Sequence, residues 1–82
     1  MKRFLSFVVL ALLAASLSAQ SARRFYKTGE DFMEVKNFRD AIEQFSNALN
    51  VDPEYEKAYI ARAHDYERLE EYEMAAKDYE RA

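Results

Sequence analysis

The sequence predicts an all-α protein: two similar helical hairpins that follow a short apolar leader. Three observations support this fold class. The 82 residues include one glycine and one proline, which leaves few sites for β-turns. Apolar side chains recur at the spacing of one helix face. The chain also matches itself at a shift of 34 residues, which pairs Phe25 with Tyr59 and Phe45 with Tyr79, and such a period is typical of stacked helical repeats.

Residues 1–19 form the predicted leader, a secretory signal peptide. Lys2 and Arg3 precede an apolar run that ends among small residues, and this three-part layout is typical of a segment cleaved during export. We expect cleavage after Ala19. The alternative is an uncleaved membrane anchor, although the apolar run of about 14 residues falls short of the roughly 20 that a spanning helix needs. The chain has no cysteine, which excludes a lipid-modified cysteine and disulfides.

Residues 20–55 form the first predicted hairpin. In its first helix, Phe25, Gly29 and Phe32 fall on one face, at i, i+4 and i+7. The second helix has a stripe of the same period, and the segment "VKN" between the two leaves room only for a tight turn. Helices joined by so short a connection lie antiparallel. Asp52–Pro53 ends the hairpin, because proline disfavours helical dihedrals in the residue before it. The inward positions of the second helix are Phe38, Ala41, Ile42, Phe45, Ala48 and Leu49.

Residues 56–82 form the second predicted hairpin, on the same plan. Small residues let its two helix axes approach closely, while aromatic rings fill the space beside them. Its inward positions are Tyr59, Ala63 and Tyr66 in the first helix and Ala75, Ala76, Tyr79 and Ala82 in the second, with "EE" as the turn. The chain stops at Ala82 before a capping helix, and solenoids usually need about three units. We therefore expect a truncated second unit that belongs to a longer protein or needs a partner.

The two hairpins resemble tetratricopeptide repeats. That family repeats aromatic and small residues at fixed positions of a helical pair, followed by proline. The matching positions are Phe25, Gly29, Phe32, Ala41, Phe45, Ala48, Pro53, Tyr59, Ala63, Tyr66, Ala75, Tyr79 and Ala82. The resemblance implies a short right-handed α-solenoid. Thr28 and Arg62 stand where the family has leucine, which is expected to weaken packing between the repeats, and neither hairpin turn contains the family's frequent glycine.

The sequence offers no basis for catalysis. It lacks cysteine, His64 is its only histidine, and neighbouring carboxylates such as Glu30 and Asp31 fall on different helix faces. Metal binding would need several convergent ligands, and one glycine cannot build a phosphate-binding loop. We therefore predict no enzyme, no cofactor, no metal site and no small-molecule substrate. Acidic and basic residues are interleaved, whereas a nucleic-acid site would show a basic stripe, so we expect no nucleic-acid partner.

The resemblance also implies a partner site. In tetratricopeptide arrays, the first helices of successive repeats line a concave groove that binds peptides. The positions that would line it here are Arg23, Tyr26, Lys27, Glu30, Met33, Glu34, Lys57, Ile60, His64, Glu67 and Arg68. The alternative is that these side chains simply face solvent. The carboxylate clamp that grips chaperone C-termini is not expected, because Tyr26, Glu30 and Ala61 occupy its positions.

These features predict an exported interaction module of the bacterial cell envelope, in the periplasm or on the periplasmic face of the outer membrane, with a protein or peptide partner. One alternative is a membrane-anchored scaffold that keeps residues 1–19. Another rests on resemblance alone. The chain is similar to the N-terminal adaptor of proteins that continue into an outer-membrane-protein-A-like, peptidoglycan-binding domain and serve type IX secretion. In that case, contact with membrane or peptidoglycan would come from downstream regions or complex partners.

Overall fold

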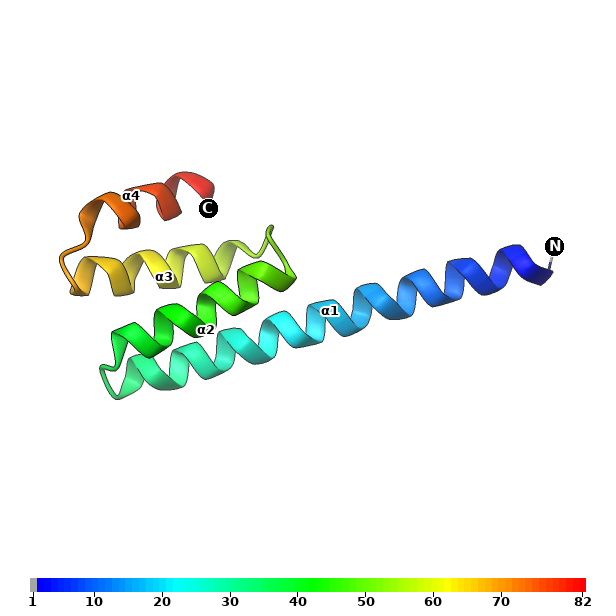
Figure 1. Ribbon diagram of the computed structural model, residues 1–82, viewed down its shortest axis with the longest axis horizontal. Helices are drawn as coiled ribbons and strands as arrows, with labels where there is room; N and C mark the ends of the chain where they lie inside the picture. Colours follow the sequence, from blue (N-terminus) through cyan, green and yellow to red (C-terminus); the bar gives the residue numbers. More distant parts are fainter. Residues whose placement is uncertain (1) are drawn as a thin grey trace.

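The computed structural model describes the backbone of residues 2–82 and the side chains of residues 8–82. Within these residues it contains four helices and no strand. The helices are α1 (Lys2–Glu34), α2 (Phe38–Val51), α3 (Glu56–Arg68) and α4 (Tyr72–Arg81). Figure 1 shows them stacked in sequence order as two hairpins, with α1 extending as a long rod beyond the other three. The predicted all-α fold of two helical hairpins is confirmed.

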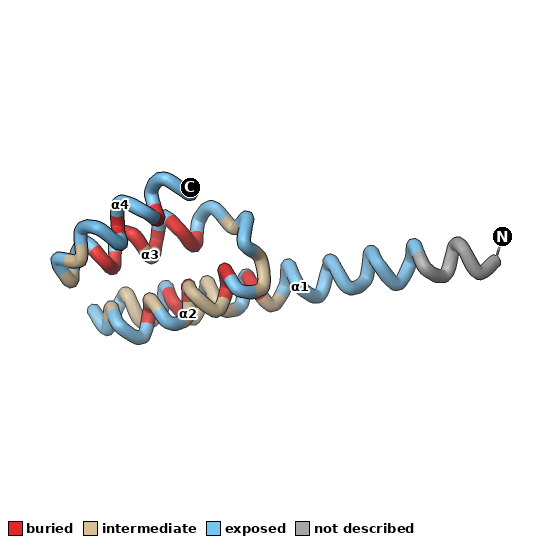
Figure 2. Tube along the Cα trace, turned by 45° about the horizontal axis from the view of Figure 1, so that its top comes forward, coloured by how far each residue is buried: buried red, intermediate tan, exposed pale blue. Residues whose placement is uncertain are grey.

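α1 runs without a break through the predicted cleavage site between Ala19 and Gln20. The leader and the first helix of the first hairpin are therefore one continuous rod. The large apolar side chains from Val8 to Leu17 are 44–65% exposed, and Ala22, at 1%, is the first buried residue after them. The packed part of the fold thus begins at Ala22, as the exposure along α1 shows (Figure 2).

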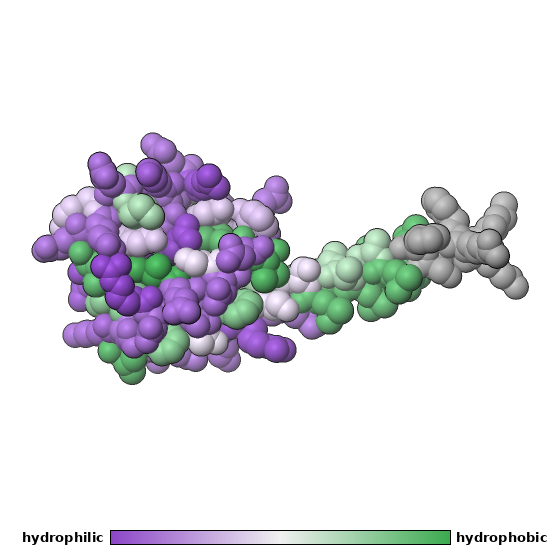
Figure 3. Space-filling view, in the orientation of Figure 1, coloured by the Kyte–Doolittle hydropathy of each residue, from purple (hydrophilic) through white to green (hydrophobic). Residues whose placement is uncertain are grey.

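The exposed part of α1 is apolar, whereas the surface of the stacked helices is mostly polar (Figure 3). None of the helices in the described part of the chain is long and apolar enough to cross a membrane. The basic start of the predicted leader, Lys2 and Arg3, lies outside the residues whose side chains are described. Cleavage of residues 1–19 and the division into units 20–55 and 56–82 stay predictions.

The two helices of the first hairpin approach each other closely at Gly29 and Phe45. The Phe45 ring is 0% exposed and lies directly over Gly29, so that a Cβ on this glycine would be 2.5 Å from Phe45 Cε1. Carbon atoms prefer a separation of about 3.5–4.0 Å, and only glycine therefore leaves room for the ring. Ala41 of α2 and Ala61 of α3 pack around the same ring, which makes Phe45 the residue that joins the first three helices.

Two further clusters complete the core. One consists of Ala48 and Leu49 of α2 with Ala58 and Tyr59 of α3, and the other of Ala63, Tyr66 and Ala75 at the contact of α3 with α4. The Tyr59 hydroxyl donates a hydrogen bond of 2.9 Å to the carbonyl of Pro53. This bond ties the connection between the hairpins to α3.

The two hairpin turns have the same backbone geometry. Lys36 and Glu70 occupy equivalent positions and adopt positive φ angles of 60° and 61°. Each turn has the pair of amide-to-carbonyl hydrogen bonds that defines a Schellman motif. These bonds run from Asn37 to Phe32, Lys36 to Met33, Glu71 to Tyr66 and Glu70 to Glu67, at 2.8–2.9 Å. Lysine and glutamate thus stand where the backbone conformation favours glycine.

The second helices of the two hairpins begin differently. The Asn37 side chain caps α2 by accepting a hydrogen bond of 3.3 Å from the amide of Asp40. Glu71, at the equivalent position before α4, makes no side-chain cap. Its carboxylate instead accepts two hydrogen bonds from Arg39 of α2, at 2.9 and 3.0 Å. Glu71 therefore links the second turn to the first hairpin rather than to its own helix.

At Arg62, where weaker packing between the repeats is expected, the structure shows polar contacts with two other helices. Its Nε and Nη2 donate to Asp78 of α4 at 2.7 and 2.8 Å, and its Nη1 donates to Ser46 of α2 at 2.9 Å. The guanidinium also lies 5.8 and 5.9 Å from the ring centroids of Tyr59 and Tyr66. Asp78 is 4% exposed, so solvent screens this bidentate pair only weakly. Arg62 connects α2, α3 and α4, where leucine would supply only apolar contact.

The end of α4 departs from the expected inward stripe. Ala75 is 3% exposed as expected, whereas Tyr79 is 40% exposed. Ala76 is also exposed, and so is Ala82 just beyond the helix. Among the described helices, α4 contacts only α3. One side of α4 therefore has no neighbour in the described structure, and the side chains nearest that side stay in solvent.

Candidate functional site: the groove between α1 and α3

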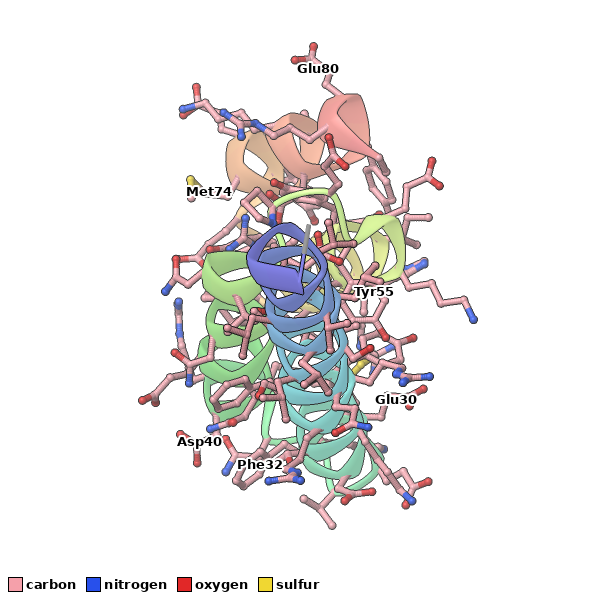
Figure 4. All side chains as sticks on the ribbon, turned by 90° about the vertical axis from the view of Figure 1, so that its right-hand side faces the viewer. Glu30, Phe32, Asp40, Tyr55, Met74 and Glu80 are labelled. Atoms are coloured by element: carbon pink, nitrogen blue, oxygen red, sulfur yellow. The ribbon has the colours of Figure 1, made fainter. Side chains whose placement is uncertain are left out.

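Two adjoining hollows lie between α1 and α3, the first helices of the two hairpins. The first, of about 340 Å³, is lined by Tyr26, Glu30, Met33, Lys57, Ile60, Ala61 and His64. The second, of about 390 Å³, is lined by Met33, Lys36, Phe38, His64, Glu67 and Arg68. Because Met33 and His64 line both, the hollows form one continuous surface, here named the α1–α3 groove. In the view along α1, Glu30 points to the side of α3, whereas Met74 of α4 points to the opposite side (Figure 4).

Most of the residues predicted to line a groove do line this one. These are Tyr26, Glu30, Met33, Lys57, Ile60, His64, Glu67 and Arg68. Arg23, Lys27 and Glu34 are exposed on α1 but line neither hollow. Lys36, Phe38 and Ala61 line the groove and are not among the predicted positions. Helical periodicity gives no signal for Lys36, because this residue lies in the turn after α1.

The first hollow has an aromatic floor. The Tyr26 ring centroid lies 5.5 Å from that of Phe45 and 5.3 Å from that of Tyr55, with tilted planes, an arrangement that aromatic pairs favour. Burial, followed by the charge of Glu30, raises the pKa of Tyr26. The hydroxyl therefore stays protonated near neutral pH and can donate a hydrogen bond. Ile60 is 40% exposed at this hollow, so the hollow offers apolar surface beside one polar donor.

A polar network at the rim of the groove ties α3 to α4. The Tyr79 hydroxyl donates a hydrogen bond to Glu67 and lies 3.3 Å from His64 Nδ1. The imidazole and phenol rings meet edge to face with their centroids 5.9 Å apart. The hydrogen bond to Glu67, followed by burial, raises the pKa of Tyr79, which keeps its hydroxyl a donor. The positions of two groove residues are thereby linked to α4.

Two cations line the second hollow. The Arg68 guanidinium lies 5.4 Å from the ring centroid of Phe38, within the range of a cation–π contact. Lys36 reaches the same hollow from the turn between α1 and α2. Neither cation forms an ion pair with a residue in the described part of the chain. The second hollow is therefore the more basic end of the groove.

Asp65 is an unusual titratable residue outside the groove. It is 0% exposed, and neither of its carboxyl oxygens has a hydrogen-bond partner. Burial raises the pKa of Asp65 to about 7. The residue lies one helical turn after Ala61, which packs on Phe45 of α2, so it belongs to the contact between the hairpins. Among the described residues, no group of three or more histidine, aspartate or glutamate side chains could hold a metal ion.

Comparison with known proteins indicates the same kind of repeat. The chain is similar to DnaJ homolog subfamily C member 7 of Homo sapiens, with 38% identity over 61 residues, and of Mus musculus, with 36% identity over 61 residues. It is also similar to the DnaJ homolog subfamily C member 7 homolog of Dictyostelium discoideum, with 30% identity over 77 residues. No family model matches the chain.

The alignments cover most of this chain but a small part of each relative. They include 74% of the chain and 12% of the human and mouse proteins, and 94% of the chain and 14% of the D. discoideum protein. The chain thus spans about an eighth of the length of the curated relatives it matches. These relatives contain tetratricopeptide repeats, and the similarity supports a tetratricopeptide-like interaction module.

Proposed function

We propose that the chain is a protein-interaction module that holds an extended segment of its partner in the α1–α3 groove. The main support is the continuity of the groove, which Tyr26 and Met33 of the first hairpin line together with Ile60 and His64 of the second. Binding sites commonly combine apolar surface with a few well-placed polar groups. The similarity to relatives that contain tetratricopeptide repeats supports the same class of function.

The dimensions of the groove suit peptide side chains. Volumes of about 340 and 390 Å³ are at the low end for pockets that enclose a whole ligand. An apolar side chain placed against Tyr26 and Ile60 would remove apolar surface from water, which contributes about 25 cal/mol per Å². The proposed binding involves no catalytic step, no cofactor and no small-molecule substrate.

Site-specific photocrosslinking tests this proposal. A photoreactive amino acid at Ile60 should crosslink to a partner in cells that express the chain, because Ile60 is in the first hollow. The same amino acid at Glu80 should not, because Glu80 points away from the stack on α4 (Figure 4). Equal crosslinking from both positions, or none from Ile60, would contradict binding in the groove.

We propose in addition that the module is exported to the bacterial cell envelope, in the periplasm or on the periplasmic face of the outer membrane. The layout of residues 1–19 supports this location. The buried residues start at Ala22, so cleavage after Ala19 would leave every one of them in place. An adaptor role in a peptidoglycan-binding or type IX secretion protein is a narrower form of this proposal, which the coding frame after Ala82 would test.

Mass spectrometry of the chain purified from expressing cells tests the export proposal. The expected N-terminal residue is Gln20. A retained Met1 would contradict cleavage and favour the membrane-anchored scaffold, in which residues 1–19 hold the hairpins at a membrane. Fractionation of the same cells into periplasm, membrane and cytoplasm then tests the location separately from the cleavage.

A further inference from the structure

The two ends of the α1–α3 groove differ in charge. In the first hollow, Glu30 and Lys57 carry opposite charges that balance. In the second hollow, Lys36 and Arg68 are accompanied by a single carboxylate, Glu67. The groove is therefore close to neutral over its aromatic floor and basic at its other end.

The Glu67 carboxylate is already engaged by other groups. It accepts a hydrogen bond from the Tyr79 hydroxyl and lies 3.9 Å from His64 Nδ1. Lys36 and Arg68 have no carboxylate partner among the described residues. Two cations thus share one hollow with little local compensation, which favours an anionic group on the partner.

The Arg68 side chain lies against the Phe38 ring. The guanidinium carbon lies 5.4 Å from the Phe38 ring centroid. The guanidinium has no ion-pair partner among the described residues, and the N–H donors of arginine bind carboxylates in pairs. Lys36 adds a second charge from a turn whose backbone is held by the hydrogen bonds of a Schellman motif.

We propose that the partner segment is an acidic, extended peptide in which a carboxylate side chain stands close to an apolar one. The carboxylate pairs with Arg68 and Lys36, and the apolar side chain lies in the first hollow against Tyr26 and Ile60. Met33 lines both hollows, so the two anchoring positions adjoin. This inference rests on the proposed function and adds the chemistry of the partner to it.

Selection of random peptides with the full chain as bait tests the inference. The enriched peptides should carry aspartate or glutamate within a few residues of leucine, isoleucine, methionine or phenylalanine. Their affinity should fall as the salt concentration rises, because salt screens exposed charge pairs. A selected acidic peptide then serves as the probe for the variants.

Charge reversal at the basic end should weaken binding of this probe. The double variant Lys36→Glu, Arg68→Glu should lose about tenfold in affinity, because each exposed pair is worth a factor of about two to five and the reversed charges repel the peptide. The neutral variant Lys36→Gln, Arg68→Gln should show a smaller loss in the same direction. If circular dichroism shows that the charge-reversed variant is not folded, the neutral variant provides the test instead.

A second charge reversal on α4 is the matched control. Lys77→Glu, Arg81→Glu makes the same change in net charge at exposed positions outside the groove, and affinity should stay within about twofold. Enriched peptides without acidic residues, or equal losses in both reversed variants, would overturn this inference and leave the proposed function intact. If Ile60→Glu weakens the binding of none of the selected peptides, both this inference and the proposed function would be overturned.

Discussion

Phe45 and Tyr79 occupy the same position in the two hairpins, yet Phe45 is 0% exposed and Tyr79 is 40% exposed. The residue opposite each ring differs. Gly29 leaves the space that the Phe45 ring fills, whereas the equivalent position in the second hairpin is Ala63, which carries a Cβ and packs with Tyr66 and Ala75. Phe45 is also covered by Ala61 of the next helix, and α4 has no such cover among the described helices. A repeated aromatic is therefore buried only where the opposite residue and the next helix both allow it.

Asp31 and Asp65 extend the comparison to a charged residue. They also occupy equivalent positions, but Asp31 is exposed and Asp65 is fully buried without a partner. Asp65 lies on the stripe of α3 that α2 covers, whereas the corresponding face of α1 is open to solvent. Whether an aspartate at this position destabilises the fold therefore depends on the neighbouring helix that buries it, because burial of an unpaired carboxylate is unfavourable.

Truncation of the two aromatic rings should have the largest effect on stability, and the effect should differ between the two hairpins. We expect Phe45→Ala to lower the free energy of unfolding by about 3–5 kcal/mol, because the buried ring leaves a cavity at the contact of three helices. Tyr79→Ala should lower it by less than about 1 kcal/mol, since much of that ring already faces solvent. Urea unfolding followed by circular dichroism measures both. Equal losses would contradict the difference in packing.

Neutralising Asp65 should make stability depend less on pH. The pKa of Asp65 in the folded chain is about 7, above its usual 3.8, so the folded chain binds this proton more tightly than the unfolded chain. The resulting stability is complete below about pH 4 and is lost as the pH rises towards about 7. Asp65→Asn should therefore raise the free energy of unfolding at pH 8 by about 2–4 kcal/mol relative to the natural chain, with no gain near pH 4.

Asp31→Asn is the control for this pH effect. Asp31 is exposed at the equivalent position, so its neutralisation should change stability by less than about 0.5 kcal/mol at either pH. Thermal unfolding of both variants at pH 4, 6 and 8 compares the two positions. If the stability of Asp65→Asn depends on pH in the same way as that of the natural chain, the raised pKa of a buried Asp65 carboxyl would be contradicted.

Exchange of the small residues tests the explanation for the two rings. Gly29→Ala places a Cβ where Phe45 Cε1 would be 2.5 Å away, and we expect a loss of about 1–2 kcal/mol in the free energy of unfolding. Helix propensity alone predicts that the same change raises the free energy of unfolding by about 1 kcal/mol. The sign of the measured change therefore shows whether the steric contact or the helix propensity dominates. Ala63→Gly should cost about 1 kcal/mol, the propensity term without a clash. A more stable Gly29→Ala variant would contradict the close contact.

Spacing along the chain suffices to predict the helices and the hairpins, because these features depend on local periodicity and on a short turn. It places Gly29 and Phe45 on inward stripes, but it does not predict that these two residues meet. The groove positions on α1 and α3 can be predicted only with the resemblance to tetratricopeptide repeats. The role of Arg62 cannot, because its partners Ser46 and Asp78 lie on two other helices. Spacing does not show which side chains of different helices meet.

Two other features escape prediction for related reasons. Lys36 reaches the groove because of the conformation of its turn, and helical periodicity ends before that residue. Asp65 lies outside the stripe of Tyr59, Ala63 and Tyr66 that periodicity assigns to the inside, and its polarity also argues for the outside. Only the packing of α2 on α3 shows that the carboxylate is buried. In both cases the missing information is three-dimensional.

Glycine in the turns should have the smallest effect, and it connects stability with binding. Lys36 and Glu70 adopt a left-handed conformation that is unfavourable for residues with a Cβ, so Lys36→Gly and Glu70→Gly should each raise the free energy of unfolding by about 0.5–1 kcal/mol. The two variants should differ in binding, because only Lys36 lines the groove. We expect Lys36→Gly to bind a selected acidic peptide about two- to fivefold more weakly, and Glu70→Gly to bind it unchanged. Fluorescence anisotropy measures the binding, and a loss shared by both variants would mean that turn geometry, rather than the charge of Lys36, controls the basic end of the groove.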